Sequence, residues 1–155
     1  MTPEELQPKV VTSNYANLTK LLEDGYTPLA ISIGKPKFFG GGEVRRLMPS
    51  WALLKLAKSG DKEGYDRQYD AKLSRLDAQE TLDTILERGN GKAALLCWEP
   101  PNKRCHRRRV AEWLRDELGV DVPEYGLAPD KTLPYRLMPS KGETLDPNEG
   151  QEQLF

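Results

Sequence analysis

Residues 93–118 read AALLCWEPPNKRCHRRRVAEWLRDEL, and this stretch decides the fold. It begins with six apolar residues in a row, which is typical of a strand that is covered on both faces. A double proline at 100–101 ends that strand. Residues 104–118 then place apolar side chains at helical spacing, until Gly119 stops the helix. A buried strand followed by an amphipathic helix is the unit from which parallel α/β sheets are built.

The residues upstream repeat this alternation of strand and helix. Two further strands are predicted over residues 9–13 and 28–33. Helices are predicted over residues 15–23, 51–58, 63–76 and 78–88. Asp77 is the expected N-cap of the last of these helices, with Glu80 three residues later. We therefore predict an α/β fold: one compact domain over residues 1–140, with a mostly parallel central sheet flanked by helices in Rossmann-like layers.

The composition limits the classes of protein that fit. Hydrophobic residues make up 37% of the 155 residues and charged residues 30%, with a formal net charge of −1. This balance excludes a strongly basic nucleic-acid coat but allows a local basic patch. The chain has no apolar run long enough to cross a bilayer and no signal peptide, so we expect no membrane contact and a cytoplasmic location. Two cysteines do not make a disulfide framework, which favours a reducing compartment.

An anion site is predicted where the strand of residues 93–98 passes into the following helix. Ligands of open α/β sheets bind beyond the carboxyl ends of the strands, and a helix start favours negative charge. Four arginines lie there within six residues: Arg104, Arg107, Arg108 and Arg109. Together they predict a phosphate-binding site, although a solvated helix face is the commoner meaning of such a run.

The same junction carries the candidate catalytic residues. Positive surroundings should lower the pKa of the Cys105 thiol, which predicts a nucleophile or an acid. His106 could exchange a proton nearby, or it could be a structural residue on the apolar stripe of the helix. Glu99 is a candidate general base. Cys97 fits either the core or the pocket wall, and its spacing from Cys105 and His106 matches no common zinc pattern, so we predict no metal and no cofactor.

Two other segments leave predicted strands at the same edge of the sheet. Ser13, Asn14 and Tyr15 follow the first strand and are expected to line the pocket. Lys35 and Lys37 lie in the next loop beside two phenylalanines. Lysines with interleaved aromatic residues could contact phosphate and stack on bases, or the phenylalanines could pack on the domain. Both interpretations of this loop stay open.

Four sequence blocks resemble one family. TSNYANL (residues 12–18), AISIGKPK (30–37), LMP (47–49) and LLCWEPPNKRCHRRRVAEWL (95–114) are similar to the DUF488 proteins, in the expected order. The most specific element is C-x7-C-H-R. The resemblance implies a compact α/β domain with a site at Cys97, Glu99, Cys105, His106 and Arg107, and it implies no particular reaction.

A shorter similarity concerns the residues Cys105, His106 and Arg107 alone. They resemble the Cys-His-Arg of O6-alkylguanine-DNA alkyltransferases, in which the cysteine accepts an alkyl group. Arg104 replaces the proline that precedes that cysteine, and the rest of that family's pattern is absent. Coincidence is the better explanation of three matching residues.

The C-terminal residues 141–155 predict a flexible acidic tail. The tail ends in Q-x-x-L-F, which resembles the peptide that DNA enzymes insert into the sliding clamp, with Gln151, Leu154 and Phe155 as contacts. Folding back onto an apolar patch is the alternative. The favoured hypothesis is a DNA-associated enzyme of repair or of base or nucleotide modification. The alternatives are a non-catalytic nucleic-acid or nucleotide binding module and an interaction protein that works through its tail.

Overall fold

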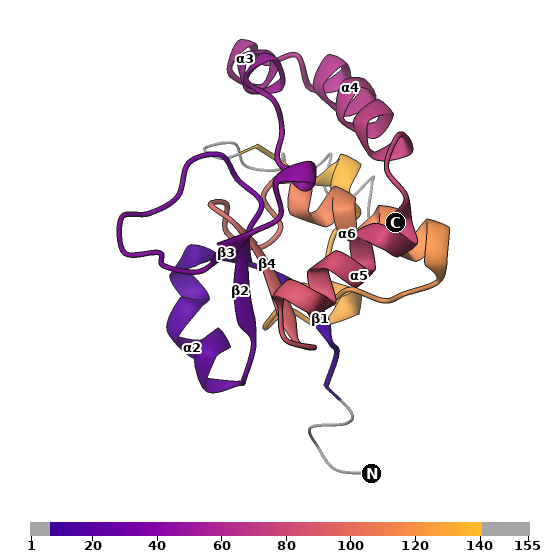
Figure 1. The fold of residues 1–155 in the computed structure, drawn as a ribbon. Coiled ribbons are helices and arrows are strands. Elements are labelled where there is room, and N and C mark those ends of the chain that lie inside the picture. The colour runs from indigo at the N-terminus through magenta and orange to yellow at the C-terminus, as the bar shows by residue number, and fades with distance from the viewer. Residues whose placement is uncertain (1–6, 141–155) are drawn as a thin grey trace.

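The computed structural model describes residues 7–140, and its centre is a sheet of four parallel strands. The strands lie in the order β1-β4-β2-β3 (Figure 1). Their bounds are Val10–Asn14 for β1, Thr27–Ala30 for β2, Gly42–Glu43 for β3 and Ala93–Cys97 for β4. Asn14 pairs with Cys97, and Ala30 pairs with Leu96. The carboxyl ends of β1, β4 and β2 therefore meet at one edge, and the predicted α/β fold is confirmed.

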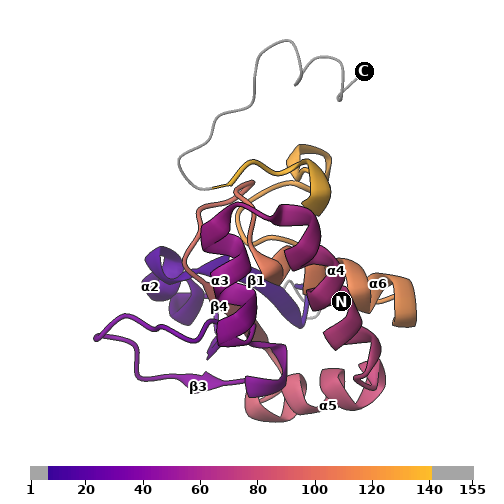
Figure 2. The ribbon, with the colours of Figure 1, turned by 90° about the horizontal axis from the view of Figure 1, so that it is seen from above.

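Helices cover both faces of this sheet, and two more lie beyond the edge where the strands end (Figures 1 and 2). One face carries α2, and the other carries α5 and α6, while α3 and α4 lie over the strand ends. Their bounds are Leu18–Glu23 for α2, Trp51–Ser59 for α3, Lys62–Ser74 for α4, Ala78–Arg88 for α5 and His106–Leu118 for α6. Short 3-10 turns lie at Tyr15–Asn17, Arg45–Leu47, Pro129–Lys131 and Tyr135–Leu137.

Alternate residues of β4 point into two separate cores. Leu95 packs with residues of α4, α5 and α6, and Leu96 packs with residues of α2 and the strand ends on the other face. Both side chains are fully buried. The continuous apolar run in the sequence arises because both faces of this strand are covered.

Several boundaries agree with the sequence prediction and others shift. The helix α5 has the predicted bounds, and Asp77 caps it by accepting a hydrogen bond from the backbone N–H of Glu80 at 2.9 Å. The helix α6 begins at His106, two residues later than predicted, with Cys105 as its N-cap. The edge strand β3 was not predicted, because two residues at the end of a glycine-rich loop give no periodic pattern. Across residues 7–140, every helix is too short or too polar to cross a membrane.

Candidate functional site

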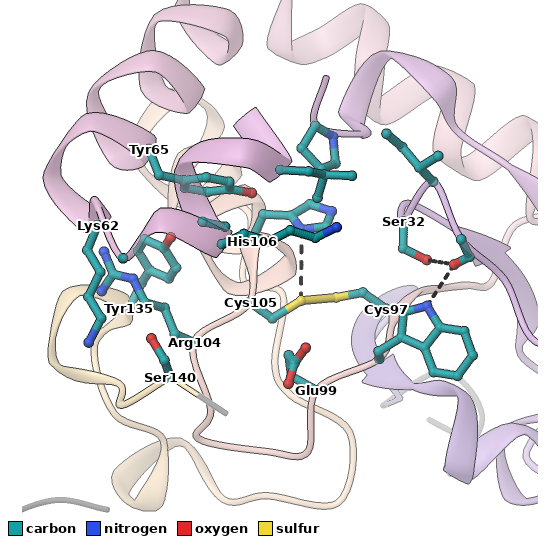
Figure 3. A pocket seen from close by; sticks show the side chains of 18 residues that line it. Ser32, Lys62, Tyr65, Cys97, Glu99, Arg104, Cys105, His106, Tyr135 and Ser140 are labelled. Atoms are coloured by element: carbon teal, nitrogen blue, oxygen red, sulfur yellow. Dashed lines mark hydrogen bonds between the residues drawn. A yellow bond between two sulfur atoms is a disulfide. The ribbon is translucent and has the colours of Figure 1, made fainter. Parts of the chain in front are cut away.

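A cavity of about 540 Å³ opens at the edge where β2 and β4 end (Figure 3). Its walls come from the segments that follow these two strands, from the start of α6, and from α3, α4 and the turn near residue 135. The polar and aromatic side chains that line it include Ser32, Lys58, Lys62, Tyr65, Cys97, Trp98, Glu99, Arg104, Cys105, His106 and Tyr135. The sequence placed a site at the strand-to-helix junction, and the cavity lies there.

The two cysteines on the cavity wall form a disulfide. The chain reverses between β4 and α6, and eight positions separate Cys97 from Cys105. This corrects the prediction that Cys105 is a free thiol with a lowered pKa, because a sulfur in a disulfide does not titrate. Both thiols become available only after the bond is reduced.

His106 is buried beside the disulfide, and its two ring nitrogens face different partners. Nε2 lies 2.6 Å from the carbonyl oxygen of Ile31, and Nδ1 lies 3.9 Å from Sγ of Cys105. A carbonyl oxygen only accepts hydrogen bonds, so Nε2 carries the proton and Nδ1 holds a free electron pair toward the sulfur. Burial lowers the pKa of His106 to about 4 against the opposing hydrogen bond to Ile31, and the charges of Arg107 and Lys72 lower it further. The imidazole is therefore neutral at pH 7.

Glu99 brings a carboxylate to the same cavity, two residues after Cys97 (Figure 3). Its Oε2 atom is buried, and among residues 7–140 no donor forms a hydrogen bond with it. A buried carboxylate oxygen without a donor is costly in a folded protein, and a catalytic role is one of the explanations for such an atom. Glu99 thus carries an acceptor atom that residues 7–140 leave unsatisfied.

A cationic and aromatic wall lies on the α4 side of the cavity. Arg104 forms an ion pair with Asp66, and its guanidinium lies 4.6 Å from the ring centre of Tyr135. The hydroxyl of Tyr135 donates to Asp66 at 2.8 Å. Desolvation by burial raises the pKa values of Tyr65 and Tyr135, so both hydroxyls stay protonated at neutral pH.

Arg107 does not reach this cavity, contrary to the predicted anion role. Its guanidinium is fully buried, with Nη2 2.7 Å from Oε2 of Glu124. Thr12 donates to the other carboxylate oxygen at 2.7 Å, which links α6 to β1. Nη1 of Arg107 also donates to Sγ of Cys97 at 3.4 Å. Arg107 is therefore a structural cation that also contacts the back of the cysteine pair.

The neighbouring arginines are also engaged by the protein. Arg108 donates to Thr12 Oγ1 and to the Val122 carbonyl oxygen, each at 2.8 Å. Arg109 pairs with Asp70 at 2.6 Å. The predicted phosphate site of clustered arginines is therefore wrong for Arg107 and Arg108, and only Arg104 of the group lines the cavity. The acceptors lie far away in the sequence, so the run RRR gave no sign of them.

Ser13 and Asn14 end β1 and Tyr15 follows it, and none of these three predicted pocket residues is in the cavity wall. Tyr15 shares a 2.6 Å hydrogen bond with Ser32 Oγ, and its ring packs 5.1 Å from that of Trp98. The hydroxyl of Ser13 accepts a hydrogen bond from a neighbouring amide, and Asn14 has a buried Oδ1 without a partner among residues 7–140. Tyr15 thus supports two lining side chains, Ser32 and Trp98, and none of the three residues lines the cavity itself.

The lysines of the next loop also lie outside the cavity wall. Lys35 pairs with Glu43 at 2.6 Å, and Lys37 is exposed. Of the two phenylalanines, Phe39 packs against Tyr15 at 5.2 Å while Phe38 is exposed. The packing interpretation therefore holds for one ring of the loop.

Sequence reasoning missed part of the cavity wall. Ser32 and Trp98 were assigned to strands, although Trp98 lies between the predicted site residues Cys97 and Glu99. Tyr65 was assigned to a buried helix face, which it also occupies, and Tyr135 lies in a segment without any periodic pattern. The contacts Gln151, Leu154 and Phe155 predicted for the tail lie outside the described residues.

Fold and site together define a three-layer α/β protein with a sulfur, imidazole and carboxylate cluster at its strand ends. A family profile described as "Active DUF488-N3 subclade" matches residues 41–118, which is half of the chain. The chain belongs to the DUF488 family. The matched range contains Cys97, Glu99, Cys105 and His106. No match was found among curated proteins or solved structures.

Proposed function

We propose that this chain is an enzyme that acts on a nucleotide or on a base of DNA, with the cavity as its active site. The observation that carries this proposal is the buried, unpartnered Oε2 of Glu99, a residue that lines the same cavity as Cys105 and His106. Polar groups that converge in one apolar cavity are typical of an active site. The matched family profile is also described as active.

The size and lining of the cavity fit a nucleotide. A volume of about 540 Å³ lies within the usual range for small-molecule sites. Trp98 and Tyr65 offer aromatic faces to a base, and Lys58 brings positive charge to a phosphate. The cation and the rings line one cavity, so a single ligand can contact both.

Within this proposal, Glu99 accepts a proton, and the reduced sulfurs of Cys97 and Cys105 form the reactive centre. His106 holds its free Nδ1 toward Cys105. Both thiols require reduction of the disulfide, and a reducing cytoplasm is the compartment that would supply it. We therefore propose a cytoplasmic location.

The link to DNA rests on the last residues of the chain. Gln151, Leu154 and Phe155 would anchor the protein to a sliding clamp, which would bring the active site to DNA. Calorimetry with a bacterial sliding clamp should show saturable binding of the full chain and none after Leu154→Ala with Phe155→Ala. Equal binding by both chains would remove the clamp as a partner.

The alternative of a non-catalytic binding module has less support. That hypothesis used a basic groove built from Arg107 and Arg108, and both guanidiniums bind protein acceptors instead. Arg104 is the one arginine of that run that lines the cavity, and it is paired with Asp66.

The test combines binding and turnover in the reduced full chain. We expect one or more nucleoside monophosphates, or a single-stranded oligonucleotide with methylated bases, to bind saturably and to be converted, as followed by mass spectrometry. Glu99→Gln should keep the affinity and lose product formation, while Lys37→Ala, outside the cavity, should change neither. Absence of binding across the panel, or wild-type turnover by Glu99→Gln, would contradict the proposal.

A further inference from the structure

Three metal-binding side chains meet on the cavity wall. The sulfurs of Cys97 and Cys105 and a ring nitrogen of His106 all lie within 4.8 Å of one another. All three residues are buried. Two of them flank the start of α6 and the third ends β4, so the fold itself brings them together although their spacing in the sequence fits no common zinc motif.

The orientation of His106 suits a metal ligand. Its Nε2–H donates to the Ile31 carbonyl oxygen at 2.6 Å, which leaves Nδ1 unprotonated and directed at Cys105. Histidines that bind zinc almost always donate their other ring N–H to a carbonyl or a carboxylate, which fixes the tautomer.

The charge around the sulfurs is also suitable. Zinc binds cysteine as the thiolate, and two thiolates balance the two charges of the ion. Nη1 of Arg107 donates to Sγ of Cys97 at 3.4 Å, a contact that stabilises negative charge on this sulfur. Glu124 compensates the charge of Arg107 through a buried ion pair, and this ion pair fixes the position of the guanidinium.

We propose that, once the disulfide is reduced, Cys97, Cys105 and His106 bind one Zn²⁺ ion, with the fourth coordination position open to the cavity. A dithiol reductant supplies two electrons and two protons, which convert the disulfide into two thiols. Zn²⁺ then displaces the two thiol protons and takes Nδ1 of His106 as its third ligand. A small-molecule disulfide that accepts two electrons reverses these steps by thiol–disulfide exchange and releases the ion.

Three protein ligands and one open position are the pattern of catalytic zinc rather than structural zinc. One His, two Cys and a glutamate that is not a ligand also form the donor set of the zinc base deaminases. This part of the inference rests on the proposed function: the substrate would be a nucleotide base, and the reaction a hydrolysis. Water would give one proton to Glu99 and its hydroxyl group to the attacked carbon, and the leaving group would take the proton from Glu99.

The experiment measures Zn²⁺ binding by the full chain after reduction with a phosphine. The chain competes with a chromogenic chelator for the added Zn²⁺, and the colour of the chelator reports how much metal the chain has bound. We expect one ion per chain and loss of thiol reactivity at both cysteines. Cys97→Ser, Cys105→Ser and His106→Gln should each weaken binding at least about tenfold. His106→Gln is the informative variant, because its amide can still donate to Ile31 but offers no Nδ1. Arg115→Ala, on the exposed side of α6, should bind zinc normally.

Two further outcomes separate this inference from the proposed function. Zinc bound by all three ligands without any nucleotide conversion would keep the metal site and overturn the enzyme. Conversion that persists in the chelated, metal-free chain, and that Cys105→Ser abolishes while Cys97→Ser does not, would instead make Cys105 a nucleophile and overturn the zinc site. A reduced chain that binds no zinc while both thiols stay reactive would also overturn it.

Discussion

At the scale of single residues, burial decides the protonation of His106. Its pKa is about 4 in the folded chain, against an ordinary value of 6.5. Above pH 6.5 the ring is neutral in both the folded and unfolded chains. Between pH 6.5 and 4 the unfolded chain binds a proton that the folded chain does not, so the free energy of unfolding falls as the pH falls.

We therefore predict that the oxidised, metal-free protein loses about 3 kcal/mol of stability between pH 7 and pH 4 through this residue. Urea denaturation at several pH values would measure the loss. His106→Gln has no titrating ring, so its stability should change less over this range. Equal slopes for the two chains would contradict the assignment.

The ion pair of Arg107 and Glu124 is the second feature at this scale. Both side chains are buried, and removing one partner leaves the other charge uncompensated. Glu124→Gln should destabilise the chain by about 3–5 kcal/mol in chemical denaturation. Asp116→Asn breaks the exposed pair with Arg115 and should cost under about 1 kcal/mol. Similar small losses in both variants would show that the buried pair does not hold α6.

Residue roles were the hardest feature to predict from the sequence. The positions of Cys105, His106 and Glu99 in one cavity followed from the strand-to-helix junction. The partners of Arg107 and Arg108 did not, because Glu124 and Val122 lie in a segment without helical or strand periodicity. Local sequence shows a run of charge, and only the tertiary fold shows which acceptors face it.

At the scale of elements, the sequence predicted the helices and strands with strong signals. The helix α5 has a capping residue at one end and glycines at the other, and its bounds agree with the prediction. The helix α6 also ends where expected, since Gly119 adopts a left-handed conformation at φ 69°. Its start moved because Arg104 lies in the connecting loop, where its backbone N–H donates to Pro139.

The cap of α5 gives a test at this scale. Asp77→Ala removes the acceptor for the N–H of Glu80 and should cost about 1 kcal/mol of stability. Asp77→Asn keeps an oxygen at the same place and should stay within a few tenths of a kcal/mol of the wild type. Thermal denaturation of both variants checks this, and equal destabilisation would show that charge, not capping, is the important property.

At the scale of the whole molecule, the sheet separates two apolar cores, and β4 contributes to both. The six-residue apolar run predicted this coverage, whereas the strand order with β4 between β1 and β2 required the structure. The cavity lies where these strands end, so the same strand that fills both cores also carries Cys97 to the site.

Truncation on either face of β4 should therefore be severe. Leu95→Ala and Leu96→Ala each remove a fully buried side chain and should cost about 2–5 kcal/mol. Leu22→Ala, at a side chain that is 54% exposed, should cost much less. Guanidinium denaturation of the three variants measures these losses. A small loss of stability at either β4 position would contradict a sheet covered on both faces.

The central claim is that ligands bind in the cavity at the ends of β2 and β4. Two-dimensional NMR of the reduced chain tests this claim most directly, with a nucleoside monophosphate that is found to bind added in steps. We predict shifts at the indole N–H of Trp98, which donates to the Gly34 carbonyl oxygen at 2.7 Å, and at the amides of Ser32 and Cys105. Shifts confined to Lys35 and Lys37, with the Trp98 signal unmoved, would contradict the account.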